Sequence, residues 1–375
     1  MRVCYFGTYR AEYSRNQIMI EGLRRAGVEV IECHEPLWNS VEDRVEAASG
    51  GWRRPGFLWR VICVYFKLIQ RFLRLEDFDI LIIGYPGQFD VFLAFFLSRL
   101  RHKPLVWDIF MSIYLIALER GLDKRSRFTI TAIRLVERLA CGLPDLLILD
   151  TEEYVKWFET THGTPKHRFC LVPTGTDERV FHPALLPAAS KNNFRVIYYG
   201  TFIPNHGVRT IVEAANMLQS EADIQFELIG HGPELEIVRE MVRRYSLSKV
   251  NFIPWLPKEE LVQRIANSSL CLGVFGVTPQ SMMTINNKIY EALAMAKPVI
   301  TGDSPTLRAA FTHGRHLYLV ERANPQELAN AISYLHSKPE LCTALSENGY
   351  SIFTDGYTPS ILGLRFKSHL DRLRS

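Results

Sequence analysis

The sequence predicts an α/β protein made of two doubly wound, Rossmann-like domains. Short apolar runs that suit buried strands alternate with helix-length amphipathic segments along both halves of the chain. The alternation stops once, at 182–193, where HPALLPAASKNN combines two prolines with small residues and little periodicity. We therefore expect one domain over 1–185, a second over 190–355, and a C-terminal helix at 356–375 that packs back on the first.

The first half opens with a strand over Arg2–Phe6 that ends at Gly7, then a polar loop, a helix near 18–26 and a strand at 28–31. This order within about 30 residues is typical of a parallel sheet. The other expected strands of this half lie at 79–84, 104–107, 145–150 and 169–172, and its helices at 90–100, 128–141 and from 151 onward.

The second half repeats the pattern. Its expected strands lie at 196–199, 226–229, 250–253, 270–274, 298–301 and 317–320, and its helices near 207–219, 233–245, 258–268, 286–296, 325–336 and 339–349. Ligands of parallel sheets bind beyond the carboxyl ends of the strands, so polar residues that follow the strands are the candidates for chemistry. We expect the two domains to face a cleft.

Charge and cysteine content limit the classes of protein to which this sequence can belong. The 375 residues include 44 basic and 40 acidic side chains, a balance that argues against a nucleic-acid-binding protein. Seven scattered cysteines without a CxxC pair indicate reduced thiols in a cytoplasmic protein. The N-terminus lacks a signal-peptide pattern, and no uncharged apolar run reaches the roughly 18 residues of a membrane span.

The expected helix at 286–296 carries Lys288 in its first turn and Glu291 one turn later. Unpaired N–H groups at a helix start, together with a lysine, suit a diphosphate, and the carboxylate can accept hydrogen bonds from a ribose diol. The alternative is a solvated Lys–Glu pair on a surface helix.

Two glycine-containing loops follow strands of the same half. The first, Tyr198–Gly207 (YYGTFIPNHG), leads into a helix and contains His206, so it suggests a site for a phosphate-sized anion. In the second, Gly230 and Gly232 bracket His231, and such a turn lets a flat group approach the backbone. The alternatives are a loop histidine without a ligand and an ordinary turn.

Four stretches of the second half resemble, in the same order, motifs of the donor domain of retaining family 4 glycosyltransferases, which have the GT-B fold. The resemblance covers about 172–335, whereas the first half is similar more loosely, through Phe6-Gly-Thr and Tyr13-Ser-Arg-Asn16. The four stretches are Val172-Pro-Thr-Gly-Thr-Asp177 with Phe181, Tyr199–Gly207, Leu228–Glu234, and Lys288-Ile-Tyr-Glu291 with Ala294 and Lys297-Pro-Val-Ile300.

The resemblance implies transfer of a hexose-type sugar, with retention, from a UDP- or GDP-linked donor to a hydroxyl of a lipid-linked, polysaccharide or glycolipid acceptor. It implies no cofactor and no metal ion. A departing diphosphate needs fixed positive charge and N–H dipoles, which Lys288, His206 and the amides near 284–287 would supply, while Glu291 would hold the ribose. The expected catalytic residues are Glu291, Lys288 and, in the first half, Asp108. The expected donor-binding residues are Gly200, His206, Gly207, Gly230, His231, Thr284, Asn286, Asn287, Lys288 and Glu291.

Three positions depart from that family. Thr201 and His206 stand where it usually has arginine and lysine, and the charge of a histidine depends on pH. Met283 stands eight residues before Glu291, where the family often has a first glutamate that contacts the donor sugar. A non-catalytic subunit of the same fold is therefore an alternative.

Two further alternatives are weaker. A nucleotide-sugar epimerase needs a set of acids or bases that moves a sugar proton, and the sequence shows no such set. A dinucleotide-binding oxidoreductase needs a GxGxxG motif after the first strand, but Gly7 is followed by no glycine until Gly22.

The acceptor side is expected on the first domain. Gly7, Arg10, Arg15 and Asn16 follow the first strand, and Asp108 follows the strand at 104–107, so all five are placed at the cleft. Asp108 could orient an acceptor hydroxyl or contact the donor sugar. The alternatives are a helix cap at Asn16 and a loop turn at Asp108.

The string Asp77-Phe-Asp79 matches the DxD pattern that binds metal in another glycosyltransferase fold. It precedes a strand and so lies at the amino end of the sheet, away from the expected cleft. We therefore expect no metal role for it.

The segment 52–75 carries six basic residues and no acid among many aromatic and aliphatic side chains. A basic amphipathic helix of this kind suits an anionic membrane surface, which predicts peripheral attachment at the cytosolic face of a membrane. The alternative is a core helix with a basic solvent face. The same interpretation extends to Arg99–Lys103.

Overall fold

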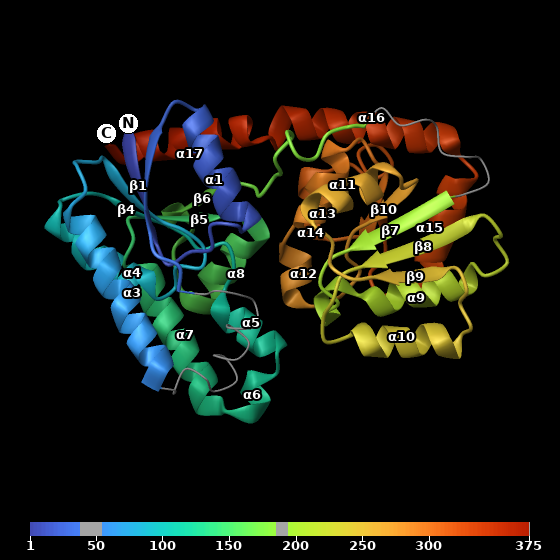
Figure 1. Ribbon diagram of the computed structural model, residues 1–375, viewed down its shortest axis with the longest axis horizontal. Coiled ribbons are helices and arrows are strands. Elements are labelled where there is room, and N and C mark those ends of the chain that lie inside the picture. Colours follow the sequence, from blue (N-terminus) through green and yellow to red (C-terminus); the bar gives the residue numbers. More distant parts are fainter. Residues whose placement is uncertain (38–54, 185–193, 375) are drawn as a thin grey trace. The chain divides into compact units, whose positions relative to one another are not determined.

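The computed structural model describes residues 1–37, 55–184 and 194–374, which form two units (Figure 1). Unit 1 consists of Met1–Pro173 with Pro359–Ser375, and unit 2 of Thr174–Thr358. The sequence-based boundary at 185 therefore lies too far along the chain. The reason is Phe181, which is buried in the core of unit 2 against Ile197 and Tyr199. Most of the expected linker, 185–193, lies outside the described residues.

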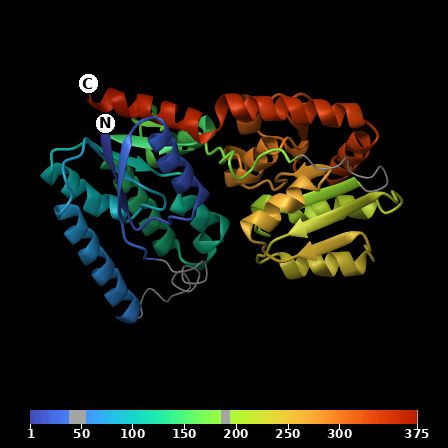
Figure 2. The same ribbon diagram turned by 45° about the horizontal axis from the view of Figure 1, so that its top comes forward.

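Each unit contains a six-stranded parallel sheet with helices on both faces, which confirms the predicted doubly wound α/β class. The orders are β2-β1-β3-β4-β5-β6 and β12-β11-β10-β7-β8-β9, and the parallel arrows of unit 2 are clear in Figure 2. The strands are β1 (Arg2–Gly7), β2 (Glu29–His34), β3 (Ile80–Ile83), β4 (Leu105–Asp108), β5 (Leu146–Leu149), β6 (Phe169–Leu171), β7 (Phe194–Tyr199), β8 (Ile224–Ile229), β9 (Val250–Ile253), β10 (Leu270–Leu272), β11 (Val299–Gly302) and β12 (Tyr318–Val320).

In unit 1, two helices cover one face of the sheet and four cover the other, as right-handed crossovers require. The first face carries α1 (Ser14–Arg25) and α17 (Pro359–Arg374), and the second carries α3 (Pro55–Leu73), α4 (Asp90–Leu100), α7 (Arg127–Gly142) and α8 (Glu152–His162). Two short helices, α5 (Ile113–Glu119) and α6 (Leu122–Arg125), precede α7.

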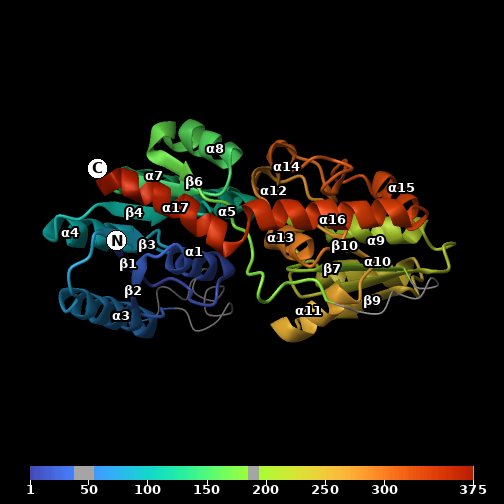
Figure 3. The same ribbon diagram turned by 90° about the horizontal axis from the view of Figure 1, so that it is seen from above.

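The C-terminal helix α17 packs across α1, and the two helices lie next to each other in Figures 1 and 3. Its buried Leu362, Phe366 and Leu370 complete the core cluster of this face. The two helices approach so closely at Gly22 and Gly363 that a Cβ on Gly363 would lie 1.8 Å from the Gly22 carbonyl oxygen. The end of the chain is thus an integral part of unit 1, where the sequence analysis placed it.

In unit 2 the strand order reverses between β10 and β7, and the carboxyl ends of strands at such a point form the usual ligand crevice of a doubly wound sheet. The loops at 200–207 and 273–286 follow these two strands. The helices of the unit are α9 (Val208–Met217), α10 (Leu235–Arg244), α11 (Lys258–Ala266), α12 (Pro279–Met283), α13 (Asn287–Ala294), α14 (Pro305–Ala310), α15 (Pro325–His336) and α16 (Pro339–Gly356), with a 3-10 turn at Pro204–His206.

Candidate functional site

The site of unit 2 centres on Lys288 in the first turn of α13. The residue is only 7% exposed, and its Nζ lies 4.1 Å from the centre of the Tyr198 ring. Nζ has no hydrogen-bond partner among the described residues. A buried ammonium without hydrogen bonds is costly, because the ring quadrupole replaces only part of its lost hydration. Lys288 is therefore held where an anion could supply the missing contacts.

Gly200 makes room for this ammonium. It follows β7 directly and has a φ of 144°, a conformation that favours glycine. A Cβ at Gly200 would lie 2.8 Å from Lys288 Nζ, inside contact distance. The backbone angle therefore favours glycine at this position, and a side chain here would also displace the end of Lys288.

Glu291 lies one turn after Lys288 and is partly buried. Burial raises the pKa of its carboxyl to about 7, against the opposing effects of the Tyr199 hydroxyl and the Lys288 charge. Burial likewise lowers the pKa of Lys288 to about 7, with Glu291 opposing the shift. Both groups therefore titrate near neutral pH, so a bound anion or a hydrogen-bonding ligand can change their charge.

Tyr198 and Tyr199, the last two residues of β7, hold this turn of α13 from opposite sides of the strand. Tyr198 provides the ring beneath the ammonium, and the Tyr199 hydroxyl donates a 3.0 Å hydrogen bond to the Lys288 carbonyl oxygen. The sequence analysis did not assign either residue to the site. The available signal was a pair of tyrosines directly before the glycine of the loop.

His206 is oriented by the loop rather than left open to donate. Its Nδ1 lies 2.6 Å from the Thr201 carbonyl oxygen and 2.9 Å from the Tyr198 hydroxyl. Burial, followed by the charge of Lys288, lowers the pKa of His206 well below its usual value, so the ring is neutral at pH 7. Because a carbonyl only accepts, Nδ1 carries the proton and Nε2 remains an acceptor. In the ligand-free state His206 therefore presents an acceptor, and not a positive charge, to the expected anion site.

The two glycine loops contact each other through their backbones. The Phe202 amide donates to the His231 carbonyl oxygen at 3.0 Å. A Cβ at Gly230, whose φ is 136°, would lie 2.0 Å from the Gly200 carbonyl oxygen. The side chain of His231 is exposed. The structure thus brings Gly200 and Gly230 together at the carboxyl ends of β7 and β8. Gly207 is the N-cap residue of α9 and lies against the backbone of Phe275 and Gly276.

In the loop before α13, Thr284 was expected to bind the donor, but its polar groups are already hydrogen-bonded. The Thr284 amide and hydroxyl both donate to the Gln280 carbonyl oxygen, so neither group is open to a ligand. Asn286 is the N-cap of α13, yet its side chain makes no capping bond, and its buried Oδ1 has no partner in the described part of the chain. Asn287 is the first residue of the helix. The Asn205 Oδ1 in the loop after β7 is unpartnered within the same ranges.

Unit 1 pairs two of its predicted site residues with each other. Arg15 and Asp108 are fully buried and form a two-pronged ion pair, with Nε–Oδ2 and Nη2–Oδ1 distances of 2.8 and 3.0 Å. The third nitrogen, Nη1, donates to the carbonyl oxygens of Val172 and Pro173 at 2.7 and 3.0 Å. Arg15 and Asp108 were expected to face the acceptor, but their polar atoms bind each other and the backbone, which corrects that expectation. The pair connects α1, β4 and the residues Val172 and Pro173 that follow β6.

Asn16 is buried and structural as well. Its side chain binds the Tyr5 hydroxyl, the backbone N–H and C=O of Tyr85, and the Arg10 carbonyl oxygen. It therefore fixes the loop after β3 instead of facing an acceptor, which corrects that expectation. Gly7 lies against the Asp90 carboxylate, and Arg10 is partly exposed with its guanidinium over the Tyr13 ring.

Asp150, at the end of β5, was missed by sequence reasoning. It is 7% exposed, and its Oδ1 is unpartnered within the described ranges. Burial raises the pKa of its carboxyl to about 7, although the charge of Arg15 acts against the shift. Its position directly after a strand was the signal that could have found it.

The DxD string lies where the sequence placed it, immediately before β3. Asp79 accepts a hydrogen bond from the Arg2 amide at 2.7 Å and pairs with Arg374 of α17 at 3.2 Å. Asp77 pairs with Lys103 at 2.9 Å. Both carboxylates thus tie the amino end of the sheet of unit 1 to its neighbours.

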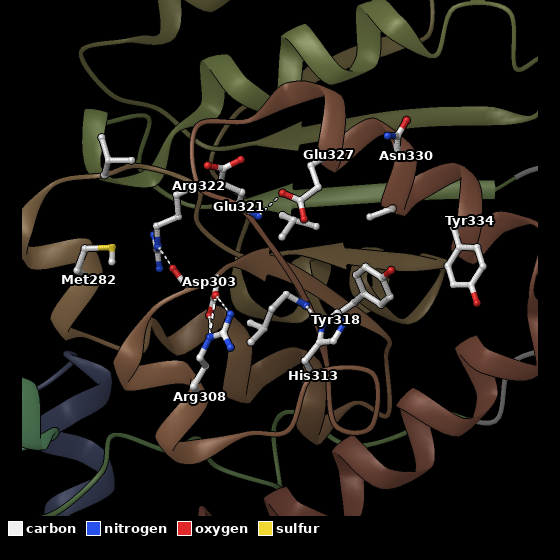
Figure 4. A pocket seen from close by; sticks show the side chains of 14 residues that line it. Met282, Asp303, Arg308, His313, Tyr318, Glu321, Arg322, Glu327, Asn330 and Tyr334 are labelled. Carbon is white, nitrogen blue, oxygen red and sulfur yellow. Dashed lines mark hydrogen bonds and ion pairs between the residues drawn. The ribbon is translucent and has the colours of Figure 1, made fainter.

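A cavity of about 1040 Å³ lies in unit 2 beyond the ends of β11 and β12 (Figure 4). Arg308 and Arg322 both point toward Asp303 there: Arg308 pairs with its carboxylate, and Arg322 Nε donates to its carbonyl oxygen at 2.6 Å. Glu327 accepts from the Glu321 amide. The donor residues predicted from the sequence do not line this cavity, which is therefore distinct from the Lys288 site.

Comparison with known proteins now defines the class. A family model described as glycosyl transferases group 1 matches residues 187–352, nearly all of unit 2. An uncharacterized glycosyltransferase of Methanocaldococcus jannaschii is 27% identical over 153 residues, 41% of each chain. An alpha-D-kanosaminyltransferase of Streptomyces kanamyceticus is 25% identical over 169 residues, 45% of this chain and 43% of the relative. The chain thus spans about two fifths of the curated relatives it matches.

Similarity of structure extends over the whole chain. The crystal structure of Anabaena HepE in complex with UDP-glucose aligns with a TM-score of 0.69 and 15% identity, covering 99% of this chain and 100% of that one. The chain therefore has the GT-B fold, and the sequence of unit 2 is similar to group 1 glycosyltransferases. None of the helices described by the structure combines the length and apolar content needed to cross a bilayer.

Proposed function

We propose that the protein is a retaining glycosyltransferase of family 4 that transfers a hexose-type sugar from a nucleotide diphosphate sugar to a hydroxyl. One observation carries the proposal: the buried ammonium of Lys288 has no hydrogen-bond partner in the described residues and lies at the start of α13, in the unit that matches group 1 glycosyltransferases. A helix N-terminus with a lysine is a favourable place for a diphosphate.

In this proposal the diphosphate lies against the first turn of α13. Lys288 supplies a charge-assisted hydrogen bond, and the amides at 287–289 supply dipoles aimed at the negative charge that grows on the leaving group. The anion also favours the charged form of Lys288, whose pKa burial has lowered to about 7. In this account these groups, instead of a metal ion, meet the charge of the leaving diphosphate.

Glu291 has the second role. Its partly buried carboxylate lies one helical turn beyond the diphosphate position and can accept hydrogen bonds from the two hydroxyls of a ribose. Among the described residues, no side chain near Lys288 is placed as an obvious nucleophile. This suits attack by the acceptor on the face that the diphosphate leaves. The base is proposed as uracil, because HepE was crystallised with UDP-glucose and the match to it covers the whole chain.

The acceptor is proposed as a glycan or lipid-linked hydroxyl at the cytosolic face of a membrane. Arg15, Asp108 and Asn16 are occupied by each other or by backbone, so Gly7 and Arg10 remain from the expected acceptor set. Asp150 is added as a candidate, because its buried carboxylate lacks one hydrogen bond within the described ranges.

The test is transfer from radiolabelled UDP- and GDP-hexoses to membrane extracts and to oligosaccharides, followed by product analysis. We expect transfer from one donor, loss of it in Glu291→Gln, and no change in the exposed control Glu340→Gln. Unchanged transfer by Glu291→Gln would remove the site assignment.

Binding of a nucleotide without transfer or hydrolysis would instead support a non-catalytic subunit, which Met283 and Thr201 favour. Conversion of the donor sugar without an acceptor would support an epimerase.

A further inference from the structure

Exposed hydrophobic side chains concentrate on one helix layer of unit 1. Of the eighteen large hydrophobic residues exposed in the described ranges, eleven lie on α3, on α4 with its cap residue Phe89, and on α7. These helices cover the same face of the sheet. Exposed apolar side chains that gather on one layer in this way are typical of an interaction site.

Helix α3 has two apolar stripes. Val64, Leu68 and Phe72 are buried toward the sheet, which accounts for the core function of the helix. Trp59, Ile62 and Phe66, at helical spacing on another side, are exposed by 59–67%. The helix, drawn in blue in Figure 2, lies at the outside of its unit. The core-helix interpretation of the segment thus accounts for one stripe and leaves the other exposed. Residues 52–54 of the segment lie outside the described residues.

Helix α4 extends the apolar surface and is fixed to α3. Phe96 and Leu100 are exposed by 70% and 65%. The Tyr65 hydroxyl on α3 donates to Asp90 Oδ1 on α4 at 2.7 Å. Beyond the other end of α4, Arg101 binds the carbonyl oxygens of Phe72 and Leu73. The two helices therefore present their outer side chains from a fixed arrangement.

Helix α7 adds a third apolar stripe to the same layer. Phe128, Leu135 and Leu139, at helical spacing, are all exposed, with Phe128 at 85%. The residues on the opposite side, Ile130 and Ala140, are buried. The stripe therefore faces away from the core of unit 1.

The charge on these three helices has one sign. Their basic residues are Arg60, Lys67, Arg71, Arg99, Arg127, Arg134 and Arg138. Their only acids are Asp90 and Glu137, and both are buried. A second copy bound through the same face would place like charges opposite each other, which disfavours a symmetric dimer.

We propose that the outer face of α3, α4 and α7 docks on a membrane surface that contains anionic lipids. Interleaved aromatic and aliphatic side chains would enter the headgroup boundary while lysine and arginine contact lipid phosphates. The inference concerns unit 1 alone and does not depend on the transfer reaction proposed for unit 2.

The test is flotation of the full chain with vesicles of phosphatidylcholine, with or without phosphatidylglycerol, at low and high salt. The wild type should bind the anionic vesicles, and binding should weaken with salt. Ile62→Gln/Phe66→Gln should lose most of the binding, whereas the control Met217→Gln/Ile237→Gln, which changes exposed residues of unit 2, should not.

Reversing the charge of basic residues on the same face tests the proposal independently. Lys67→Glu/Arg134→Glu should weaken vesicle binding at least about fivefold for each basic residue lost, whereas Arg243→Glu/Arg244→Glu in unit 2 should leave it unchanged. The proposal is overturned if the wild type fails to bind anionic vesicles. It is also overturned if the glutamine variant binds the vesicles as the wild type does. A third contrary outcome is light scattering that shows a dimer for the wild type and a monomer for the glutamine variant.

Discussion

Two buried charged groups, the Arg15–Asp108 pair of unit 1 and Lys288 of unit 2, differ in whether their polar atoms have hydrogen-bond partners. In unit 1, Arg15 and Asp108 satisfy each other, and every guanidinium nitrogen has a partner. In unit 2, Lys288 is almost as deeply buried, but its ammonium lacks a hydrogen bond in the described residues. Sequence position alone made both sets candidates for chemistry, and only the second retains bonding capacity for a ligand.

This difference separates a charge whose partners lie within the fold from one that is available to a ligand. A buried pair contributes to stability only while both partners remain, so it should respond to mutation as a structural element. An unpaired buried cation lowers stability until a ligand binds it. Its mutation should therefore weaken ligand binding and raise the stability of the ligand-free protein.

The largest effect is expected at the pair in unit 1. Asp108→Ala leaves Arg15 charged and buried, which should lower the free energy of unfolding by about 3–5 kcal/mol. Urea unfolding followed by circular dichroism measures the change. The exposed pair of Lys367 and Asp371 on α17 is the control, and Asp371→Ala should cost no more than about 1 kcal/mol. Equal stability of Asp108→Ala and the wild type would contradict the structural role.

The next effect is expected on nucleotide affinity. Lys288→Met removes the charge-assisted hydrogen bond to a diphosphate and should weaken UDP binding by about 1.5–3 kcal/mol, measured by calorimetry. Lys297 offers a matched control, because its ammonium already donates to the Ala266 and Ser268 carbonyl oxygens. Lys297→Met should therefore lower stability and leave affinity unchanged. A reversed pattern for the two lysines would contradict the comparison.

The smallest effect is a pH dependence of stability. Burial raises the pKa of Glu291 from 4.5 to about 7, so the folded state holds a proton that the unfolded state has lost, and stability falls as pH rises across that range. Burial lowers the pKa of Lys288 from 10.5 to about 7, so stability rises with pH from 7 to 10.5.

Melting curves of the ligand-free protein check both signs. The Tm advantage of Lys288→Met over the wild type should be largest below pH 7 and shrink toward pH 10. The Tm advantage of Glu291→Gln over the wild type should grow between pH 4.5 and 7. A Tm difference that does not change with pH would show that these groups are not buried as charges.

The fold was largely predictable because long apolar runs and helical periodicity are local properties. Helices α4 and α15 lie on the expected bounds. Helix α8 begins where expected, with Thr151 as its cap accepting from the Tyr154 amide. Helices α5, α6, α12 and α14 were not predicted, since each has seven residues or fewer and therefore shows too little periodicity.

The site was predictable only in part, because its decisive property is which polar groups have partners. The loops and the Lys288–Glu291 turn follow from strand–loop–helix order. The Arg15–Asp108 pair joins residues 93 positions apart, and nothing local in the sequence indicates that they meet. Tyr198 and Tyr199 read as ordinary strand aromatics until α13 is placed against them.

The central claim is that Lys288 lowers stability until a nucleotide diphosphate binds it. The most direct measurement is the Tm of the wild type and of Lys288→Met at pH 7, each with and without UDP. Without UDP the variant should melt at a higher temperature. With UDP at about 100 times the wild-type Kd, the wild type should gain roughly 2.7 kcal/mol and the variant much less. A variant that melts lower without UDP and gains as much with it would contradict the account.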